Sequence, residues 1–305
     1  MKKKLSMFLI IILIIAGLSL LLYPFVANQW NTYRQTKLIT SYDKSVSEKN
    51  AQNSINYVAE WETADAYNDE LLPMILPDSF AIAAASDEPD EEYMSCLNLN
   101  GDGMMGYVEI PKINIKLPIF HTVSEEVLQT AAGHLEGSSL PVGGSSNHAV
   151  ISAHRGLPSA ALFTDLDKLE LGDHFLLYVL DDTLCYEVDQ ILVVQPSETD
   201  ALQVEEGQDY VTLLTCTPYG VNSHRLLVRG HRVEYVEEVV MDEHIPLAEM
   251  SMHTNYLMWV VIGLAVAGVF ILILAYREKQ LRKRLAERDR MRDIIDFDKD
   301  NSKKE

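Results

Sequence analysis

The sequence predicts a mainly β domain, built as a closed barrel or a sandwich, between two membrane-spanning helices. Short segments rich in Val, Ile, Leu, Tyr and Thr recur from Gly106 onward, separated by Gly, Pro, Asp and Asn. Many short strands with few helices are typical of barrels and sandwiches. Two charge-free apolar runs, Leu5–Ala27 and Tyr256–Tyr276, stand near the two ends of the chain. Each is long enough to cross a bilayer as a helix, which takes roughly 20 residues.

The first apolar run is expected to be an uncleaved membrane anchor. Three lysines precede it, and eight Lys and Arg residues follow the second run between Arg277 and Arg292. Positive charge marks the cytoplasmic side of a span, so both termini should lie inside and residues 28–255 outside. A cleaved signal peptide is the alternative, but the run is long for one and bulky Phe25 stands in the candidate cleavage site. Either way, the middle of the chain is exported.

The exported segment is strongly acidic. Residues 28–255 hold 11 Lys and Arg against 37 Asp and Glu, a formal charge of −26. This charge argues against nucleic acid as a partner, because phosphate backbones are bound by basic surfaces. It also argues against adhesion to anionic lipid. An acidic surface is typical of a soluble domain at a crowded cell surface.

The segment between the first run and the strands divides into two parts. Residues 31–72 contain no Gly or Pro and place Ile55, Val58 and Trp61 at a loose helical period, which predicts one or two helices. Residues 73–103 are acidic and interrupted by Pro and Gly, which predicts a long loop. Loops of this length are usually lids or are disordered.

The end of this loop resembles a calcium-binding pattern. Asn98, Asn100 and Asp102, followed by Glu109, have the spacing of a calcium loop. The first ligand is neutral, however, and Glu109 falls inside a predicted strand rather than at the start of a helix. A glycine turn into the first strand accounts for the same residues, so we expect no metal and no cofactor.

Seven strands are expected after Gly106. They are Tyr107–Ile110, Ile115–Ile119, His148–Ala153, His174–Leu180, Leu184–Val194, Val211–Thr215 and Leu226–Val233. Val127–Ala132 and Ala160–Leu169 are expected to be short helices or turns. Together these segments are long enough to bury a sizeable core.

The chain has three cysteines, Cys96, Cys185 and Cys216. An odd number in an exported protein leaves at least one thiol outside any disulfide. The sequence neither requires nor excludes a disulfide between Cys96 and Cys185. Cys216 ends an apolar strand and is followed by a Pro-Tyr-Gly turn at 218–220 and then by Arg225. A thiolate is a strong nucleophile, although a lone cysteine at a strand end is more often a small buried apolar residue.

A cysteine nucleophile needs a histidine to transfer protons, and donors to stabilise the oxyanion that forms on attack at a carbonyl. Arg225 can supply these donors through a guanidinium that stays charged. Nine histidines compete for the partner role. His154 is favoured because it lies where a strand meets a loop, and catalytic groups concentrate at such rims. His224, next to Arg225, is the alternative.

Several motifs resemble the sortases, the transpeptidases of Gram-positive cell surfaces. Thr-Leu-Leu-Thr-Cys at 212–216 is similar to the TLxTC signature of that family. The segments that resemble class C, the pilin-polymerising group, are 106–113, 133–144, 152–158 and 216–225. The resemblance covers the whole predicted β region, residues 104–233.

The resemblance implies an eight-stranded sortase-type β-barrel with short helices and a catalytic triad, which falls here on His154, Cys216 and Arg225. Class C sortases also cover the active site with a lid that carries an Asp-Pro-aromatic anchor. The nearest segment in this chain is Asp-Ser-Phe at 78–80, which lacks the proline. In that role Asp78 would face the arginine and Phe80 would cover the thiol.

The implied reaction is transpeptidation. The enzyme would cleave an LPxTG-like sorting signal after its threonine and join the acyl group to a lysine side chain of a pilin subunit, which builds covalent pili. A housekeeping sortase would pass the acyl group to a cell-wall precursor, and a cysteine hydrolase would pass it to water. A non-catalytic membrane-anchored surface receptor would need none of the triad. These alternatives stay open.

The expected organisation follows from these segments. In order, it comprises an N-terminal transmembrane anchor or signal peptide (1–28), an extracellular helical segment with a lid loop (29–103), the catalytic β-barrel (104–236), a linker (237–255), a second transmembrane helix (256–276) and a cytoplasmic charged tail (277–305). We therefore expect a two-span protein of the cell membrane with its catalytic domain outside.

Overall fold

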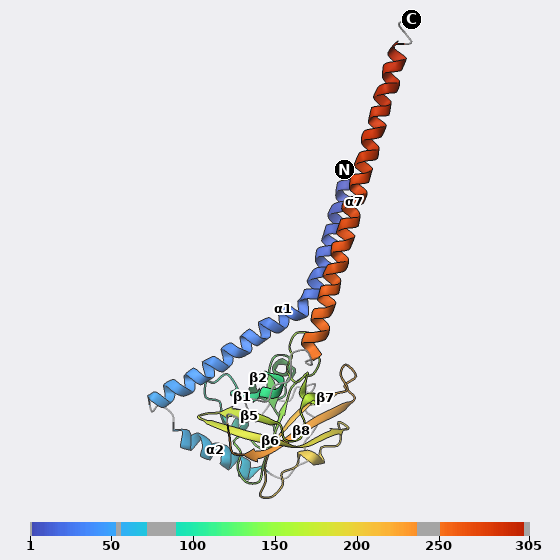
Figure 1. Ribbon diagram of the computed structural model, residues 1–305. Coiled ribbons are helices and arrows are strands. Elements are labelled where there is room, and N and C mark those ends of the chain that lie inside the picture. Colours follow the sequence, from blue (N-terminus) through green and yellow to red (C-terminus); the bar gives the residue numbers. More distant parts are fainter. Residues whose placement is uncertain (1, 53–55, 72–89, 237–250, 302–305) are drawn as a thin grey trace. The chain divides into compact units, whose positions relative to one another are not determined.

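The computed structural model describes residues 2–52, 56–71, 90–236 and 251–301 (Figure 1). The chain forms two compact units. One consists of Met1–Leu22 and Asn255–Glu305, and the other of Tyr23–Thr254. The second unit contains every strand in the part of the chain that the structure describes.

Eight strands close into a barrel in the order β1-β2-β3-β4-β7-β8-β6-β5 (Figure 1). Their bounds are β1 Met104–Ile110, β2 Ile115–His121, β3 Ala132–His134, β4 Asn147–Ser152, β5 His174–Val179, β6 Asp182–Val194, β7 Asp209–Thr217 and β8 His224–Val233. Short 3-10 turns lie at Pro111–Ile113, Leu166–Lys168 and Asp200–Leu202. The predicted mainly β fold is confirmed, and closure decides for a barrel over a sandwich because it leaves no sheet edge unpaired.

Two neighbouring pairs in the barrel are parallel. β2 pairs parallel with β3 and β4 pairs parallel with β7, whereas the other neighbours are antiparallel. A tight hairpin cannot join parallel strands, so β5 and β6 intervene in sequence between β4 and β7. The parallel pairing places the C-terminal ends of β4 and β7 at one rim of the barrel. β8 begins at the same rim, because it runs antiparallel to β7.

The barrel interior is filled by apolar and aromatic side chains. Phe175 on β5 and Tyr186 on β6 are fully buried, and their rings stack with centroids 5.6 Å apart. Gly230 on β8 lies against them, and a Cβ atom there would come within 2.7 Å of the Phe175 ring. Full burial of one large apolar side chain contributes roughly 1.5–3 kcal/mol to folding, so a larger residue at 230 would have to displace a major part of this core.

The helices predicted in residues 31–72 are present, and they pack on the outside of the barrel. From Tyr23 on, α1 (Lys2–Ala51) belongs to the barrel unit. Its Tyr42 hydroxyl donates to the carbonyl of Met105 at 3.0 Å and accepts from the backbone N–H of Leu180 at 2.8 Å. α2 (Tyr57–Glu70) is held by Asn68, whose side chain bonds both the N–H and the carbonyl of Leu140.

The prediction of a loop at residues 73–103 is wrong for residues 91–95, because these form the short helix α4 (Glu91–Ser95). Asp90 caps this helix by accepting from the N–H of Glu92. Tyr93 anchors it, because its side chain is fully buried and bonded to His134 of β3. Residues 72–89 lie outside the described residues, and with them the candidate lid residues Asp78 and Phe80.

Two local details near β3 differ from what the sequence indicated. The segment Val127–Ala132, expected to be a short helix or turn, contains the end of α5, which spans Glu125–Leu128. It starts earlier because the Ser124 side chain accepts from the N–H of Val127 and caps it there. The strand β3 was missed because three residues, Ala-Gly-His, are too few to show an alternation of apolar and polar positions.

Among the residues that the structure describes, two helical segments are long and apolar enough to cross a membrane. They are Leu9–Asn50 in α1 and Val260–Arg288 in α7 (Ser251–Asn301), with peak mean hydropathy of 2.8 and 2.4. They contain most of the two apolar runs that the sequence predicted to be spans. Their length and composition are consistent with membrane anchoring.

Candidate active site

Cys216 and Arg225 lie opposite each other at the rim of the barrel. The antiparallel register of β7 and β8 pairs Cys216 with Arg225 across the turn that joins the two strands. Directly opposed residues have Cβ atoms about 4.5–5.5 Å apart. Both side chains are nearly buried, with 6% and 9% of their surfaces exposed. Arg225 is oriented by its Nη1, which donates to the carbonyls of Asn222 and His224, each at 3.2 Å.

His154 reaches the same rim from the other side of β7. The parallel register pairs Ser152 of β4 with Leu214 of β7. The alignment continues past the end of β4, because the N–H of Ala153 donates to the carbonyl of Leu214 at 3.1 Å. His154 and Cys216 are therefore level with each other. The rival His224 is paired with Thr217 in the ladder, and its Nδ1 contacts the Ser223 hydroxyl at 2.9 Å.

The imidazole of His154 is subject to two opposing effects. Burial lowers its pKa, because the charged ring loses hydration. The carboxylate of Glu125, on α5, lies 3.7 Å from Nε2 and raises the pKa. Burial is the larger effect, so the pKa of His154 lies below its ordinary value. Sequence spacing gave no signal for Glu125, because its approach to His154 depends on the position of α5.

The loop that carries His154 is fastened to β7 by Arg155, another residue that spacing did not single out. Arg155 Nη1 donates to the Thr217 hydroxyl at 3.2 Å, and Nη2 forms an ion pair with Asp167. The carbonyl of His154 accepts from the N–H of Phe163 at 3.1 Å. The backbone of His154 is thus fixed on both sides, which limits how far the imidazole can move from the thiol.

Gly156 lets the turn after β7 pack closely on this loop. Its φ is +79°, in the left-handed region, and a Cβ atom there would lie 3.0 Å from the ring of Tyr219. Tyr219 belongs to the Pro-Tyr-Gly turn that separates Cys216 from Arg225. The turn and the His154 loop therefore contact each other beside the thiol.

A small hollow adjoins Arg225. It lies between β7, β8 and the connection from β6 to β7. Its lining residues are Val194, Gln195, Pro196, Glu198, Thr199, Leu202, Leu214, Arg225 and Leu227. The hollow is small, so it marks space next to the Arg225 guanidinium and is not by itself large enough to hold a peptide segment.

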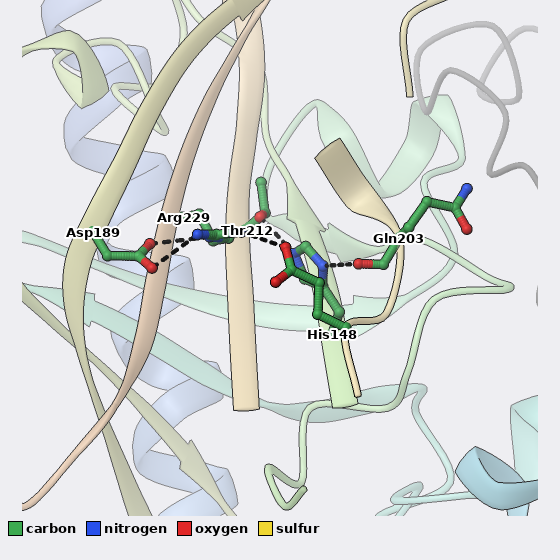
Figure 2. A network of polar contacts seen from close by, with 6 residues as sticks. His148, Asp189, Gln203, Thr212 and Arg229 are labelled. Carbon is green, nitrogen blue, oxygen red and sulfur yellow. Dashed lines mark hydrogen bonds and ion pairs between the residues drawn. The ribbon is translucent and has the colours of Figure 1, made fainter. Parts of the chain in front are cut away.

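Arg229 lies outside this grouping. It pairs with Thr212 in the ladder and forms two hydrogen bonds to Asp189, at 3.0 and 2.9 Å (Figure 2). Its guanidinium also lies over the ring of Tyr210, 3.9 Å from the centroid, and bonds Glu205. These contacts hold the guanidinium of Arg229, whereas Arg225 is the arginine that lies opposite Cys216.

The calcium pattern is accounted for by local contacts. Asn98 accepts from the N–H of Gly103, and Asp102 accepts from the N–H of Met104, as expected for a turn that leads into β1. Glu109 forms a cross-strand ion pair with Lys116 at 3.1 Å. No group of three or more His, Cys, Asp or Glu placed to hold a metal ion occurs among the residues described.

The three cysteines, all within the described residues, form no disulfide and are buried. Burial raises the pKa of Cys96, and the nearby Glu92 raises it further. A raised pKa disfavours the thiolate, which is the reactive form. Cys216 is the cysteine that lies beside a histidine and an arginine, so it is the candidate nucleophile.

Comparison with known proteins agrees with this arrangement. The sequence matches the Sortase domain family over residues 108–233. Sortase C of Streptococcus pneumoniae is 44% identical with a TM-score of 0.57, and the match covers 65% of this chain and 97% of that structure. Sortase C1 of Streptococcus agalactiae is 46% identical with a TM-score of 0.56, covering 66% and 100%. Sortase A of Streptococcus agalactiae is 26% identical over 259 residues, covering 80% of this chain and 94% of the relative.

A closed barrel of this topology, with a thiol, an imidazole and a guanidinium at one rim, is the architecture of a cysteine transpeptidase. The chain belongs to the sortase family, and its identity of 42–46% to sortase C structures supports class C. Sortases act on proteins that carry a sorting signal.

Proposed function

We propose that this chain polymerises pilin subunits, with Cys216 as nucleophile, His154 as the proton-transfer group and Arg225 as the oxyanion donor. The strongest support is the register of three adjacent strands, in which β4, β7 and β8 carry these residues to one rim. The similarity to sortase C of Streptococcus pneumoniae, which has pilin substrate specificity, favours a pilin partner.

In the acylation step, Cys216 reacts as a thiolate with the proton on His154, and its sulfur attacks the carbonyl carbon after the threonine of an LPxTG-like signal. Negative charge develops on the carbonyl oxygen, and the guanidinium of Arg225 stabilises it. The C–N bond then breaks as protonated His154 gives its proton to the departing nitrogen. The product is a thioester between Cys216 and the shortened substrate.

In the transfer step, a lysine side chain of a second pilin subunit attacks the thioester. Neutral His154 takes a proton from the amine, the C–S bond breaks, and the thiolate leaves. An isopeptide bond joins the two subunits, and the enzyme returns to its starting state. The buried position of the thiol limits the access of bulk water to the thioester.

The proposed location follows from charge and length. α1 and α7 anchor the protein in the cell membrane as two spans, both termini lie in the cytoplasm, and the barrel lies outside, where pilin subunits are exported. The acidic barrel domain is proposed to bind no nucleic acid.

Two other acceptors define the competing functions. A housekeeping sortase would transfer the acyl group to a cell-wall precursor, and a hydrolase would transfer it to water. The alternative of a non-catalytic receptor is excluded, because the chain belongs to the sortase family of transpeptidases.

The test is a product analysis with the full-length protein in detergent. An LPxTG-like peptide is supplied with a pilin lysine peptide, with an amine of the cell-wall-precursor type, or with neither, and the products are identified by mass spectrometry. The isopeptide-linked product should dominate, and Cys216→Ala should form none. A dominant cell-wall-type adduct or free acid would instead support a housekeeping sortase or a hydrolase.

A further inference from the structure

The carboxylate of Glu125 is held in a defined position beside His154. One oxygen, Oε1, accepts from the side-chain amide of Gln129 at 3.0 Å, and the other, Oε2, lies 3.7 Å from His154 Nε2. Gln129 is the C-cap residue of α5, one helical turn after Glu125, so the end of this short helix orients the carboxylate. The helix is fixed to the barrel by Leu128, which is fully buried.

In the proposed mechanism, the Glu125 carboxylate can stabilise the protonated form of His154. His154 must be protonated when it releases the leaving amine, but burial disfavours the charged ring. A carboxylate within 4 Å stabilises an imidazolium through charge attraction, and it does so while leaving the opposite ring edge for the substrate.

We propose that Glu125 is a positioning residue for His154, which orients the imidazole and favours the protonated form that serves as the acid in acylation. The inference rests on the proposed role of His154. It adds Glu125 to the residues around the thiol. Glu125 lies on α5, which is not a strand of the barrel.

The other ionisable groups near His154 come from β7, β8 and the loop after β4. The Cys216 thiol approaches from β7 and the Arg225 guanidinium from β8. The charge of Arg155, in the loop after β4, is paired with Asp167. Glu125 is the negative charge that raises the pKa of His154.

The adjacent Glu126 provides a matched control. Both glutamates are exposed and lie in the first turn of α5. Replacing either by glutamine removes one negative charge from the same short helix. The two variants therefore differ in the contact with His154, and not in the net charge of the protein.

The first measurement does not depend on substrate. The pKa of His154 is determined by NMR titration of histidine-labelled, full-length protein in detergent, in a Cys216→Ala background that removes coupling to the thiol. The side chain of Glu125 is 58% exposed, so the effect should be that of a surface pair. We expect Glu125→Gln to lower the pKa of His154 by about 0.5 unit. Glu126→Gln should leave it within about 0.1 unit, and Glu125→Asp should recover part of the shift.

The second measurement uses single-turnover acylation of Cys216 by an LPxTG-like peptide across pH. The alkaline limb, where His154 loses its proton, should move to lower pH by the same amount in Glu125→Gln, giving a loss of about threefold on that limb. The difference from wild type should shrink in about 1 M salt, because salt screens an exposed pair. A purely structural role would not produce this dependence on salt.

The outcomes separate the inference from the proposed function. An unchanged pKa of His154 in Glu125→Gln, or an equal shift in Glu126→Gln, would overturn the role of Glu125 even if wild-type acylation requires Cys216. If Glu125→Gln shifts the pKa of His154 but the wild-type protein is not acylated by the peptide, the Glu125–His154 contact is supported. The proposed catalytic role of His154 is then refuted.

Discussion

Two arginines on β8, four residues apart, have different surroundings. Arg225 lies opposite Cys216 and beside a hollow, whereas Arg229 is bound to Asp189 and Glu205. We predict that Arg225→Ala lowers the rate of acylation by about 10²–10³, the usual loss for one oxyanion donor. Arg225→Lys should recover only part of the rate, because an ammonium keeps the charge but lacks the planar fork. Single-turnover acylation by a sorting-signal peptide measures both.

The matched control for this prediction is Arg229→Ala, which removes the same side chain from the same strand. Among the molecules that stay folded, its acylation rate should remain close to that of wild type. A slow Arg229→Ala beside a near-normal Arg225→Ala would show that Arg229 is the oxyanion donor.

His134 should make the stability of the protein depend on pH. It is fully buried, and its ring accepts from the Tyr93 hydroxyl and donates to the carbonyl of Ser139. Burial lowers its pKa from 6.5 to about 4. The unfolded chain therefore binds a proton at a higher pH than the folded chain does, so stability falls as the pH drops from about 6.5 to about 4. The loss should approach about 3 kcal/mol.

The measurement is denaturant unfolding of the full chain between neutral and acidic pH. Other groups titrate over the same range, so the quantity to compare is the difference between wild type and His134→Gln. The variant should be less stable at neutral pH and less sensitive to acid. The same pH dependence in both proteins would refute the contribution of His134.

At the scale of elements, the connection from β6 to β7 is fastened at its C-terminal end. Figure 2 shows His148 of β4 between the Thr212 hydroxyl and the carbonyl of Gln203, and Arg229 bound to Asp189. The carbonyl of Gln203 only accepts, so Nδ1 of His148 carries the proton and Nε2 accepts from Thr212. Polar contacts, buried at His148 and Thr212 and partly exposed at Asp189, thus join four strands and the connection beside the hollow that adjoins Arg225.

Loss of this network should reduce stability. We predict that Arg229→Ala lowers the free energy of unfolding by about 1–3 kcal/mol, because Asp189 loses a charged partner. Chemical denaturation measures this effect, and Asp189→Asn should reproduce it more weakly. An Arg229→Ala protein of unchanged stability would contradict the structural role of the network.

At the scale of the whole molecule, the two apolar helices and the charges beside them determine the proposed topology. We predict that an exposed position in the barrel domain, Asp182→Cys, reacts with a membrane-impermeant maleimide on intact cells, whereas Arg290→Cys in α7 does not. Both should react once the membrane is dissolved, and the parent chain, with its three buried thiols, gives the background. Labelling of Arg290→Cys on intact cells would place the C-terminus outside.

The sequence by itself determined what local pattern and neighbouring residues encode. The two apolar runs, the helices before the barrel and seven of the strands follow from periodicity, length and turn residues. The opposition of Cys216 and Arg225 was also predictable, because a short turn joins consecutive strands and leaves little freedom in register. The short strand β3 and the start of α5 were not, since three residues show no alternation and the cap at Ser124 decided where the helix begins.

Only the tertiary structure decided which distant residues meet. His154 is level with Cys216 because β4 and β7 pair in parallel, and parallel pairing depends on closure of the whole barrel rather than on a local turn. Glu125 reaches His154 because α5 is fixed by the burial of Leu128. Arg225 and Arg229 lie on the same face of one strand, and their positions relative to the turn already favoured Arg225 as the partner of Cys216. The structure added what holds Arg229, the carboxylates of Asp189 and Glu205, because such long-range contacts are set by packing and not by spacing along the chain.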